Sequence, residues 1–171
     1  AIDAGGIGKG LAADLTVSLL LGSGGGGGGN PLDASYSAVY GAPLCDTVGS
    51  ECDSVGLLDG RANLGPEPNQ PNTVDSCTDG TSGSYHSDES NDRLVVRTLD
   101  GSDFAAGSTV EVSATFYAWS TGSNDTVDLY YAADASNPSW THITSIGAPG
   151  GGTQTVSAQY TLPSGSVQAV R

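Results

Sequence analysis

An alternating stretch near the start of the sequence, followed by a run of glycines, constrains the fold of this chain more than any other feature. From Leu11 to Leu21 aliphatic residues occupy every second position, which is the pattern of a β-strand with one apolar face. These positions are Leu11, Ala13, Leu15, Val17, Leu19 and Leu21. The stretch continues into Gly22, Ser23 and Gly24–Gly29, a linker with almost no conformational preference. A segment that must bury one face is therefore loosely tethered to the rest of the chain.

The same stretch leaves alternatives open. Leu11, Leu15 and Leu19 are also four residues apart, which would suit a short amphipathic helix, although Thr16 and Val17 favour a strand. A linker of about eight residues reaches roughly 16 Å, enough for the strand to return to its own sheet. Insertion into a neighbouring subunit, which we expect, would gain at most about 8–18 kcal/mol from aliphatic burial before the cost of ordering. Such head-to-tail contacts form filaments when they do not close.

Charge and cysteine content narrow the class of protein. Nineteen Asp and Glu residues oppose five Lys and Arg residues, giving a net charge of −14, so no basic surface exists for nucleic-acid binding. No apolar run is long enough to span a membrane. The three cysteines suit an oxidising compartment, and the start at Ala1 without Met is typical of a mature secreted chain. We expect an extracellular, secreted protein.

The rest of the chain predicts an all-β protein, an antiparallel, jelly-roll-like β-sandwich with a detached N-terminal strand. Residues 1–29 form the tail and linker, and residues 30–171 form the sandwich domain. Prolines make residues 30–91 largely irregular, whereas alternation and turn signals make residues 92–171 strand-rich. The expected strands are Arg93 to Leu99, Thr109 to Trp119, Thr126 to Ala132, Trp140 to Ile146, Thr155 to Leu162, and a last one beginning at Val167.

Two covalent modifications can be proposed from the sequence. Cys45 and Cys52 are seven residues apart and can close a small loop that staples the irregular region. The alternative is that they hold this region to the sheets through Cys77, but we favour the Cys45–Cys52 disulfide. Asn124 begins the sequon Asn-Asp-Thr and would be a glycosylation site in a producer that glycosylates secreted proteins, making the chain a glycoprotein.

Ligand-binding candidates are an acidic loop and a set of aromatic residues. The densest carboxylate cluster lies in a loop rich in glycine and serine, where it could bind calcium or simply be solvated. It comprises Asp75, Asp79, Asp88, Glu89 and Asp92. Four aromatic residues could form a sugar platform or lie half-buried on the sandwich: Tyr117, Trp119, Tyr130 and Trp140. No catalytic motif accompanies His86 or His142, so we do not expect an enzyme, and no cofactor other than calcium is implied.

Several short segments together resemble a known module. They are Ser54–Arg61, Gly65–Asn69, Asp79–Ser90, Asp128–Ala133, Pro138–Trp140, Tyr160–Gly165 and Gln168–Arg171. Over Cys45–Arg171, about three quarters of the chain, the sequence resembles the carboxy-terminal β-sandwich module of secreted bacterial hydrolases and proteases. The resemblance implies that the chain of relatives continues past the position of Arg171 into a further strand that bears a cysteine. That cysteine is the expected partner of Cys77. Where those relatives carry an enzyme, this chain has only its strand-like tail and linker.

These observations predict a structural subunit of an extracellular filament. The strand at residues 11–21 would insert into the neighbouring subunit to make a homopolymer, an arrangement similar in logic to that of chaperone–usher pilins. The alternative is a non-catalytic accessory module of a secreted hydrolase that binds carbohydrate or a cell surface.

Overall fold

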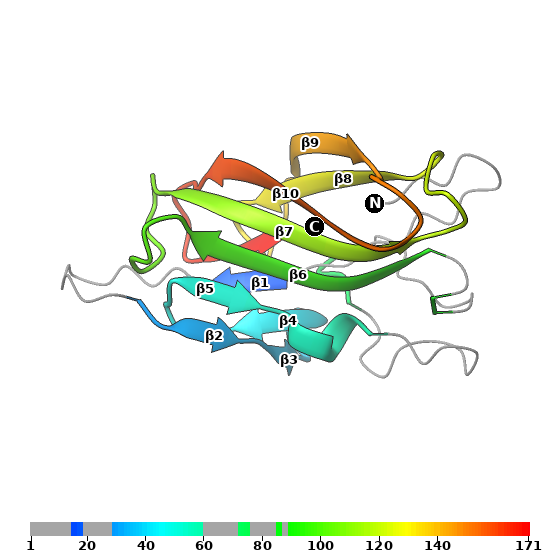
Figure 1. Ribbon diagram of the computed structural model, residues 1–171. Helices are drawn as coiled ribbons and strands as arrows, with labels where there is room; N and C mark the ends of the chain where they lie inside the picture. The colour runs from blue at the N-terminus through cyan, green and yellow to red at the C-terminus, as the bar shows by residue number, and fades with distance from the viewer. Residues whose placement is uncertain (1–14, 19–28, 60–71, 76–84, 87–88) are drawn as a thin grey trace.

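The chain folds into two β-sheets that pack face to face, as the computed structural model shows for residues 15–18, 29–59, 72–75, 85–86 and 89–171 (Figure 1). The six-stranded sheet has the order β3 (Ser35–Ser37), β4 (Ala42–Cys45), β1 (Leu15–Ser18), β11 (Val167–Val170), β8 (Thr126–Ala132), β9 (Thr141–Gly147). The five-stranded sheet has the order β10 (Gly152–Thr161), β7 (Thr109–Ala118), β6 (Ser90–Thr98), β5 (Glu51–Asp53), β2 (Pro31–Asp33). One 3-10 turn, η1 (Val55–Leu58), follows β5. The predicted all-β sandwich is confirmed.

The long strands form because their alternation matches the two environments of a sheet. In β7 every second side chain is buried: Val110, Val112, Ala114, Phe116 and Ala118. The intervening positions face outward, where Ser113 pairs with Ser157 of β10 at 2.8 Å and Thr115 pairs with Thr155 at 3.0 Å. These hydroxyl pairs join neighbouring strands on the polar face. The ladder between β7 and β10 therefore runs without a break from Thr109–Thr161 to Ala118–Gly152.

Side chains from both sheets fill the interior of the sandwich. Val96 and Phe116 come from the five-stranded sheet, and Leu129 and Val170 come from the six-stranded sheet. A second apolar cluster forms around Ala132, Ala135 and Ala169, with Trp140 and Val74 packed against it. Ala169 and Val170 are neighbours in β11 but belong to different clusters, so the second cluster lies on the outer face of the six-stranded sheet.

The region 29–59 contains short strands where the sequence favoured irregular chain. β2, β3 and β5 have three residues each and β4 has four, too few to give a clear alternation. Pro31 lies in β2 at the edge of its sheet, the usual place for a proline in a strand. Two pairings, β1 with β4 and β2 with β5, are parallel, so the predicted antiparallel pattern does not extend to them.

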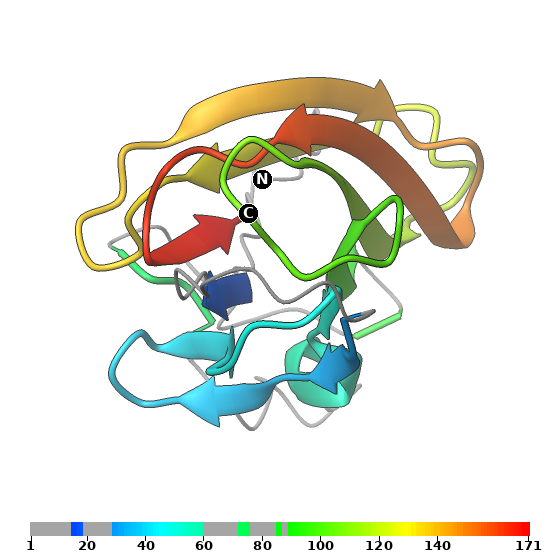
Figure 2. The same cartoon turned by 90° about the vertical axis from the view of Figure 1, so that its left-hand side faces the viewer.

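β1 lies inside the six-stranded sheet of its own chain. Figure 2 shows it in dark blue between β11 in red and the cyan strand β4. The structure thus has a strand, and not a helix, at Leu15–Ser18, docked as in the self-docking alternative. The other assembly-strand positions, Leu11, Ala13, Leu19 and Leu21, lie outside the described residues.

Candidate assembly site

The first part of the site is the ladder on either side of β1. On one side β1 pairs antiparallel with β11, from Leu15 opposite Val170 to Ser18 opposite Val167. On the other side it pairs parallel with β4, with Thr16 opposite Leu44 and Val17 opposite Cys45. No described backbone pairing joins β4 to β11 directly. Within the described residues, β1 is therefore what makes the six strands one continuous sheet.

The β11 side of the site is held firmly by contacts that do not involve β1. Arg171 and Tyr130 exchange two backbone hydrogen bonds of 2.9 Å, which extends the pairing of β11 with β8. The Arg171 guanidinium donates a 2.7 Å hydrogen bond to Asp75 and lies 4.0 Å from the centre of the Trp140 ring. Trp140 Nε1 also donates to Asp75, at 2.7 Å. These contacts anchor the end of β11 to the body of the protein.

Gln168 of β11 is a buried polar residue in the same wall. Its side chain is only 2% exposed, and its Nε2 donates a 2.6 Å hydrogen bond to the Pro163 carbonyl. Oε1 has no hydrogen-bond partner among the described residues. In the ladder Gln168 lies opposite Val17. The wall that β11 presents to β1 therefore contains a buried amide.

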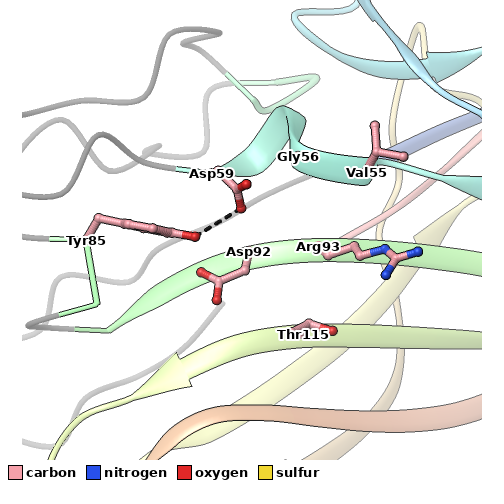
Figure 3. A pocket seen from close by; sticks show the side chains of 7 residues that line it. All are labelled: Val55, Gly56, Asp59, Tyr85, Asp92, Arg93 and Thr115. Atoms are coloured by element: carbon pink, nitrogen blue, oxygen red, sulfur yellow. Dashed lines mark hydrogen bonds between the residues drawn. The ribbon is translucent and has the colours of Figure 1, made fainter.

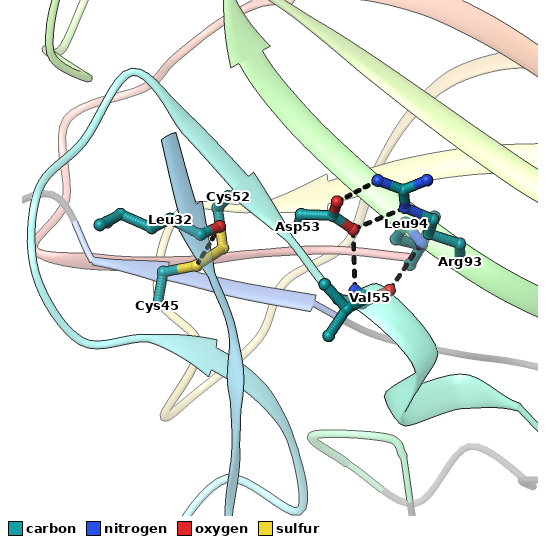
Figure 4. Close-up of a disulfide and its surroundings, with 8 residues drawn as sticks. Leu32, Cys45, Cys52, Asp53, Val55, Arg93 and Leu94 are labelled. Carbon is teal, nitrogen blue, oxygen red and sulfur yellow. Dashed lines mark hydrogen bonds and ion pairs between the residues drawn. A yellow bond between two sulfur atoms is a disulfide. The ribbon is translucent and has the colours of Figure 1, made fainter. Parts of the chain in front are cut away.

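The β4 side depends on a covalent bond. β4 pairs with the edge strand β3 and with β1, and Cys45 at its end forms a disulfide with Cys52 of β5 in the other sheet (Figure 4). The Cα atoms of the two cysteines are 5.9 Å apart, and both residues are buried in the core. The predicted Cys45–Cys52 pairing is confirmed. Cys77 lies outside the described residues.

Gly29, the first described residue after β1, is held by hydrogen bonds to two loops. Its N–H donates a 2.9 Å hydrogen bond to the Gly101 carbonyl, and its own carbonyl accepts a 2.9 Å bond from Ser50 Oγ. A Cβ atom added at Gly29 would collide with Asp103 and Ser50, so only glycine fits there. The tether between β1 and the body is therefore residues 19–28, of which six of ten are glycines.

A separate open depression of about 480 Å³ lies beside β6 (Figure 3). Its lining residues are Val55, Gly56, Asp59, Tyr85, Asp92, Arg93 and Thr115. Asp92 sits at a register shift between β6 and β7, accepts a 2.6 Å hydrogen bond from Ser90 and lies 2.8 Å from His86 Nε2. Burial raises the pKa of Asp92 despite both of these contacts. Because Ser90 Oγ donates to Asp92 and not to His86, these residues do not form a nucleophile–base pair.

The neighbouring groups in the depression also have partners within the protein. Tyr85 donates a 3.0 Å hydrogen bond to Asp59, and the His86 ring stacks between Tyr85 and Tyr117 with centroid distances of 3.9 and 5.0 Å. Burial, followed by the charges of Asp92 and Asp59, raises the pKa of the Tyr85 hydroxyl. Asp59, Tyr85 and Asp92 of the depression are therefore hydrogen-bonded within the protein, and sequence spacing gave no signal for this arrangement.

The Asp53–Arg93 pair next to this depression fixes β5 against β6. Arg93 Nε donates a 2.7 Å hydrogen bond to Asp53, its Nη2 donates to the other carboxylate oxygen, and the Val55 N–H donates to Asp53 at 2.8 Å (Figure 4). Burial by itself would raise the pKa of Asp53, but these hydrogen bonds and the Arg93 charge hold it below its ordinary value. Val55 has φ +46°, a strained value for a β-branched residue that the bond to Asp53 helps to hold.

The predicted calcium residues are only partly described. Asp75 bonds to Trp140 and Arg171, whereas Asp92 bonds to Ser90 and His86, so the structure gives these two carboxylates separate partners. Glu89 is described, and Asp79 and Asp88 lie outside the described residues. Within the described part of the chain, no three His, Cys, Asp or Glu side chains come together as a metal site.

The predicted aromatic platform is divided between the sheets. Tyr117 of β7 stacks on His86, and Trp119 just beyond it is 59% exposed. Tyr130 of β8 contacts His142, and Trp140 belongs to the second cluster on the six-stranded sheet. The four rings therefore do not form one surface. The sequon residue Asn124 lies in an exposed turn before β8, where a glycan could be accommodated.

Comparison with protein-family models, with curated proteins and with solved structures gave no match to this chain. Among the described residues there is no helix of the length and apolarity that crossing a membrane would require.

Proposed function

We propose that this protein is a structural subunit of an extracellular filament and that subunits join by exchange of the β1 strand. The observation that carries the proposal is that β1, a strand in the middle of a sheet, is joined to the chain that follows it by the glycine-rich residues 19–28. Such a segment has little conformational preference, so β1 can leave its sheet without disturbing the chain that follows Gly29.

The energetics of exchange support the proposal. A second copy has the same sequence, so a strand inserted into a neighbour makes the same ladder contacts as a self-docked strand. The free-energy difference between the two arrangements is then mainly the entropy of the tether and of association, and not lost contacts. Concentrated protein should therefore favour exchange.

Head-to-tail exchange gives each subunit one donor strand and one acceptor sheet. Such heterologous contacts extend into an open filament when the rotation between subunits does not close a ring. The buried disulfide suits an oxidising, extracellular location, and the charge of −14 suits a protein that must stay soluble before assembly. The protein is proposed to act without catalysis.

Electron microscopy of the purified full chain over a range of concentrations tests the proposal. Unbranched filaments are expected at high concentration, and Val17→Asp should abolish them because it places a carboxylate opposite Cys45 and Gln168. Val39→Asp is the matched control, because Val39 is 87% exposed in the turn before β4. Only monomers at every concentration would overturn the proposal. In that case retention of the monomer on an insoluble glycan, lost in Trp119→Ala, would support the carbohydrate-binding alternative.

If Val17→Asp fails to fold, a peptide can be used with the unmodified protein. A synthetic peptide of residues 11–21, added in excess, should compete for acceptor sheets and shorten the filaments. A scrambled peptide of the same composition should leave their length unchanged. Filaments that are indifferent to both peptides would show that assembly does not use this strand.

A further inference from the structure

We propose that the gap between β4 and β11 is the acceptor site for β1 of a second copy, which enters in the register seen within the single chain. Self-docked and incoming strands then compete for one site. This inference rests on the proposed function and adds to it the receiving strands, the register, and the state of the subunit before assembly.

Both walls of the gap exist without β1. The β11 wall is tied to β8 by backbone bonds and to the body by Arg171 and Asp75. The β4 wall is tied to β3 by a ladder and to the other sheet by the Cys45–Cys52 disulfide. When β1 leaves, each wall keeps its own attachments and presents unpaired backbone groups to the gap. Two facing strand edges are a strong template for one further strand.

The chemistry of the walls fixes the register of the incoming strand. In β11, Val170 belongs to the interior cluster and Ala169 to the outer cluster. In β4, Cys45 belongs to the interior cluster. A slip of one residue would move every position of the inserted strand to the opposite face of the sheet, so positions 15 and 17 would no longer lie opposite Val170 and Cys45. A second copy of β1 is therefore expected to pair with β4 and β11 in the same register as the self-docked strand, with Leu15 opposite Val170.

The orientation of the strand is fixed as well. β1 is parallel to β4 and antiparallel to β11, and these two neighbours point in opposite directions. An incoming strand in the reverse direction would meet a different ladder on each side. Every junction along a filament would therefore have the same polarity.

The competition has a consequence for the free subunit. A self-docked β1 occupies the acceptor site of its own chain. The monomer then has neither a free donor strand nor an open acceptor site for a neighbour. Assembly then requires β1 to leave before a neighbour can enter. The expected behaviour is a slow start followed by faster growth onto ends whose acceptor is open.

Engineered cysteine pairs in a Cys77→Ser background test the register and the competition. Directly opposed residues such as Ser18 and Val167 have Cα atoms within disulfide range, whereas the diagonal pair Ser18 and Ala169 lies about 7–8 Å apart. Chains with Ser18→Cys alone are mixed with chains with Val167→Cys alone, assembled, and oxidised with oxidised glutathione. The yield of covalent dimers from this mixture should exceed, by at least about tenfold, the yield from the diagonal mixture of Ser18→Cys chains with Ala169→Cys chains.

The double variant Ser18→Cys/Val167→Cys, oxidised as a dilute monomer, tests the competition. Its β1 is locked in place, so assembly should be lost, while the diagonal double variant should assemble like the parent. Filaments without the expected cross-link would overturn the register and leave the proposed function standing. A locked monomer that assembles normally would overturn the competition. Absence of filaments from the Cys77→Ser parent and from the unmodified chain would instead overturn the proposed function.

Discussion

The ladder formed by β6, β7 and β10 and the part of the other sheet formed by β3, β4, β1 and β11 are built in different ways. β7 and β10 pair over their full lengths, from Thr109 to Ala118, and their alternation buries one complete face. β4 and β1 share only two opposed pairs, and β3 and β4 share three. Short ladders hold their strands weakly, so this region relies on a disulfide, an ion pair and a tethered strand. The difference indicates that the short-strand region can exchange β1 while the core held by β6, β7 and β10 stays intact.

The first way to test this contrast is to damage the long-strand region. Phe116 is 0% exposed in the centre of β7, and Phe116→Ala should lower the free energy of unfolding by about 3–5 kcal/mol because it leaves a cavity in the shared core. Urea denaturation measures the change. Leu99→Ala, at a half-exposed position, is the control and should change stability by less than about 0.5 kcal/mol. Similar losses for both would contradict the location of the core.

The second test acts on the disulfide of the short-strand region. Replacing Cys45 and Cys52 with alanine should lower stability by about 2–3 kcal/mol, as expected for a loop that spans seven positions. Hydrogen exchange should accelerate chiefly in β4 and β1 and remain slow in β6 and β7. Cys77→Ser is the control for loss of a cysteine outside this bond. Uniform acceleration over both sheets would show that the two regions are not separable.

The third test removes the charge that joins β5 to β6. Asp53→Asn should cost about 2 kcal/mol at pH 7, since it breaks the pair with Arg93 and weakens the acceptor for the strained Val55. The pKa of Asp53 is lowered in the folded protein, so its contribution is complete above the unfolded pKa of about 3.9. The contribution is lost as the pH falls through the folded value.

Urea denaturation of Asp53→Asn and of the unmodified protein from pH 7 to pH 2 measures this dependence. The two proteins should converge in stability at the acid end. Glu111→Gln, which alters the exposed pair with Arg97, is the control and should cost less than about 1 kcal/mol. A constant difference between Asp53→Asn and the unmodified protein over the whole range would contradict the role assigned to the Asp53 charge.

The smallest expected effect comes from the tether. Inserting ten Gly and Ser residues after Ser23 doubles its length and should weaken self-docking by about 0.6 kcal/mol, through loop entropy alone. Insertion into a neighbour does not close this loop, so the concentration needed for assembly should fall about threefold. Light scattering over a dilution series measures it. A rise in that concentration would indicate that the tether itself contacts the neighbouring subunit.

The sequence predicted the strand-rich region well because long alternation carries the information. Thr126–Ala132 was predicted to the residue, and the strand expected from Thr109 ends one residue earlier, at Ala118. The disulfide was also predictable, because two cysteines at close spacing in one loop leave few alternatives. The four short strands of the region 29–59 were missed because segments of three or four residues show no periodicity.

The partners of β1 could not be read from the sequence. Alternation shows that one face of a segment must be buried, but it does not show against what. The parallel neighbour β4 is itself a short strand that contains Pro43, a residue that argues against an inner strand. The contacts around His86 and Asp92 were equally hidden, because they depend on a register shift in β6 and on residues brought together from separate loops.

The position of β1 between two strands determines how it would respond to force. Tension applied to β1 along its own axis would act across its hydrogen bonds to β4 and β11, which run roughly perpendicular to that axis. The bonds on both sides would then be loaded together in shear, and could not be peeled off one after another from an end. The pairing of Leu15–Ser18, held in this way, would resist stretching far better than its small number of bonds suggests.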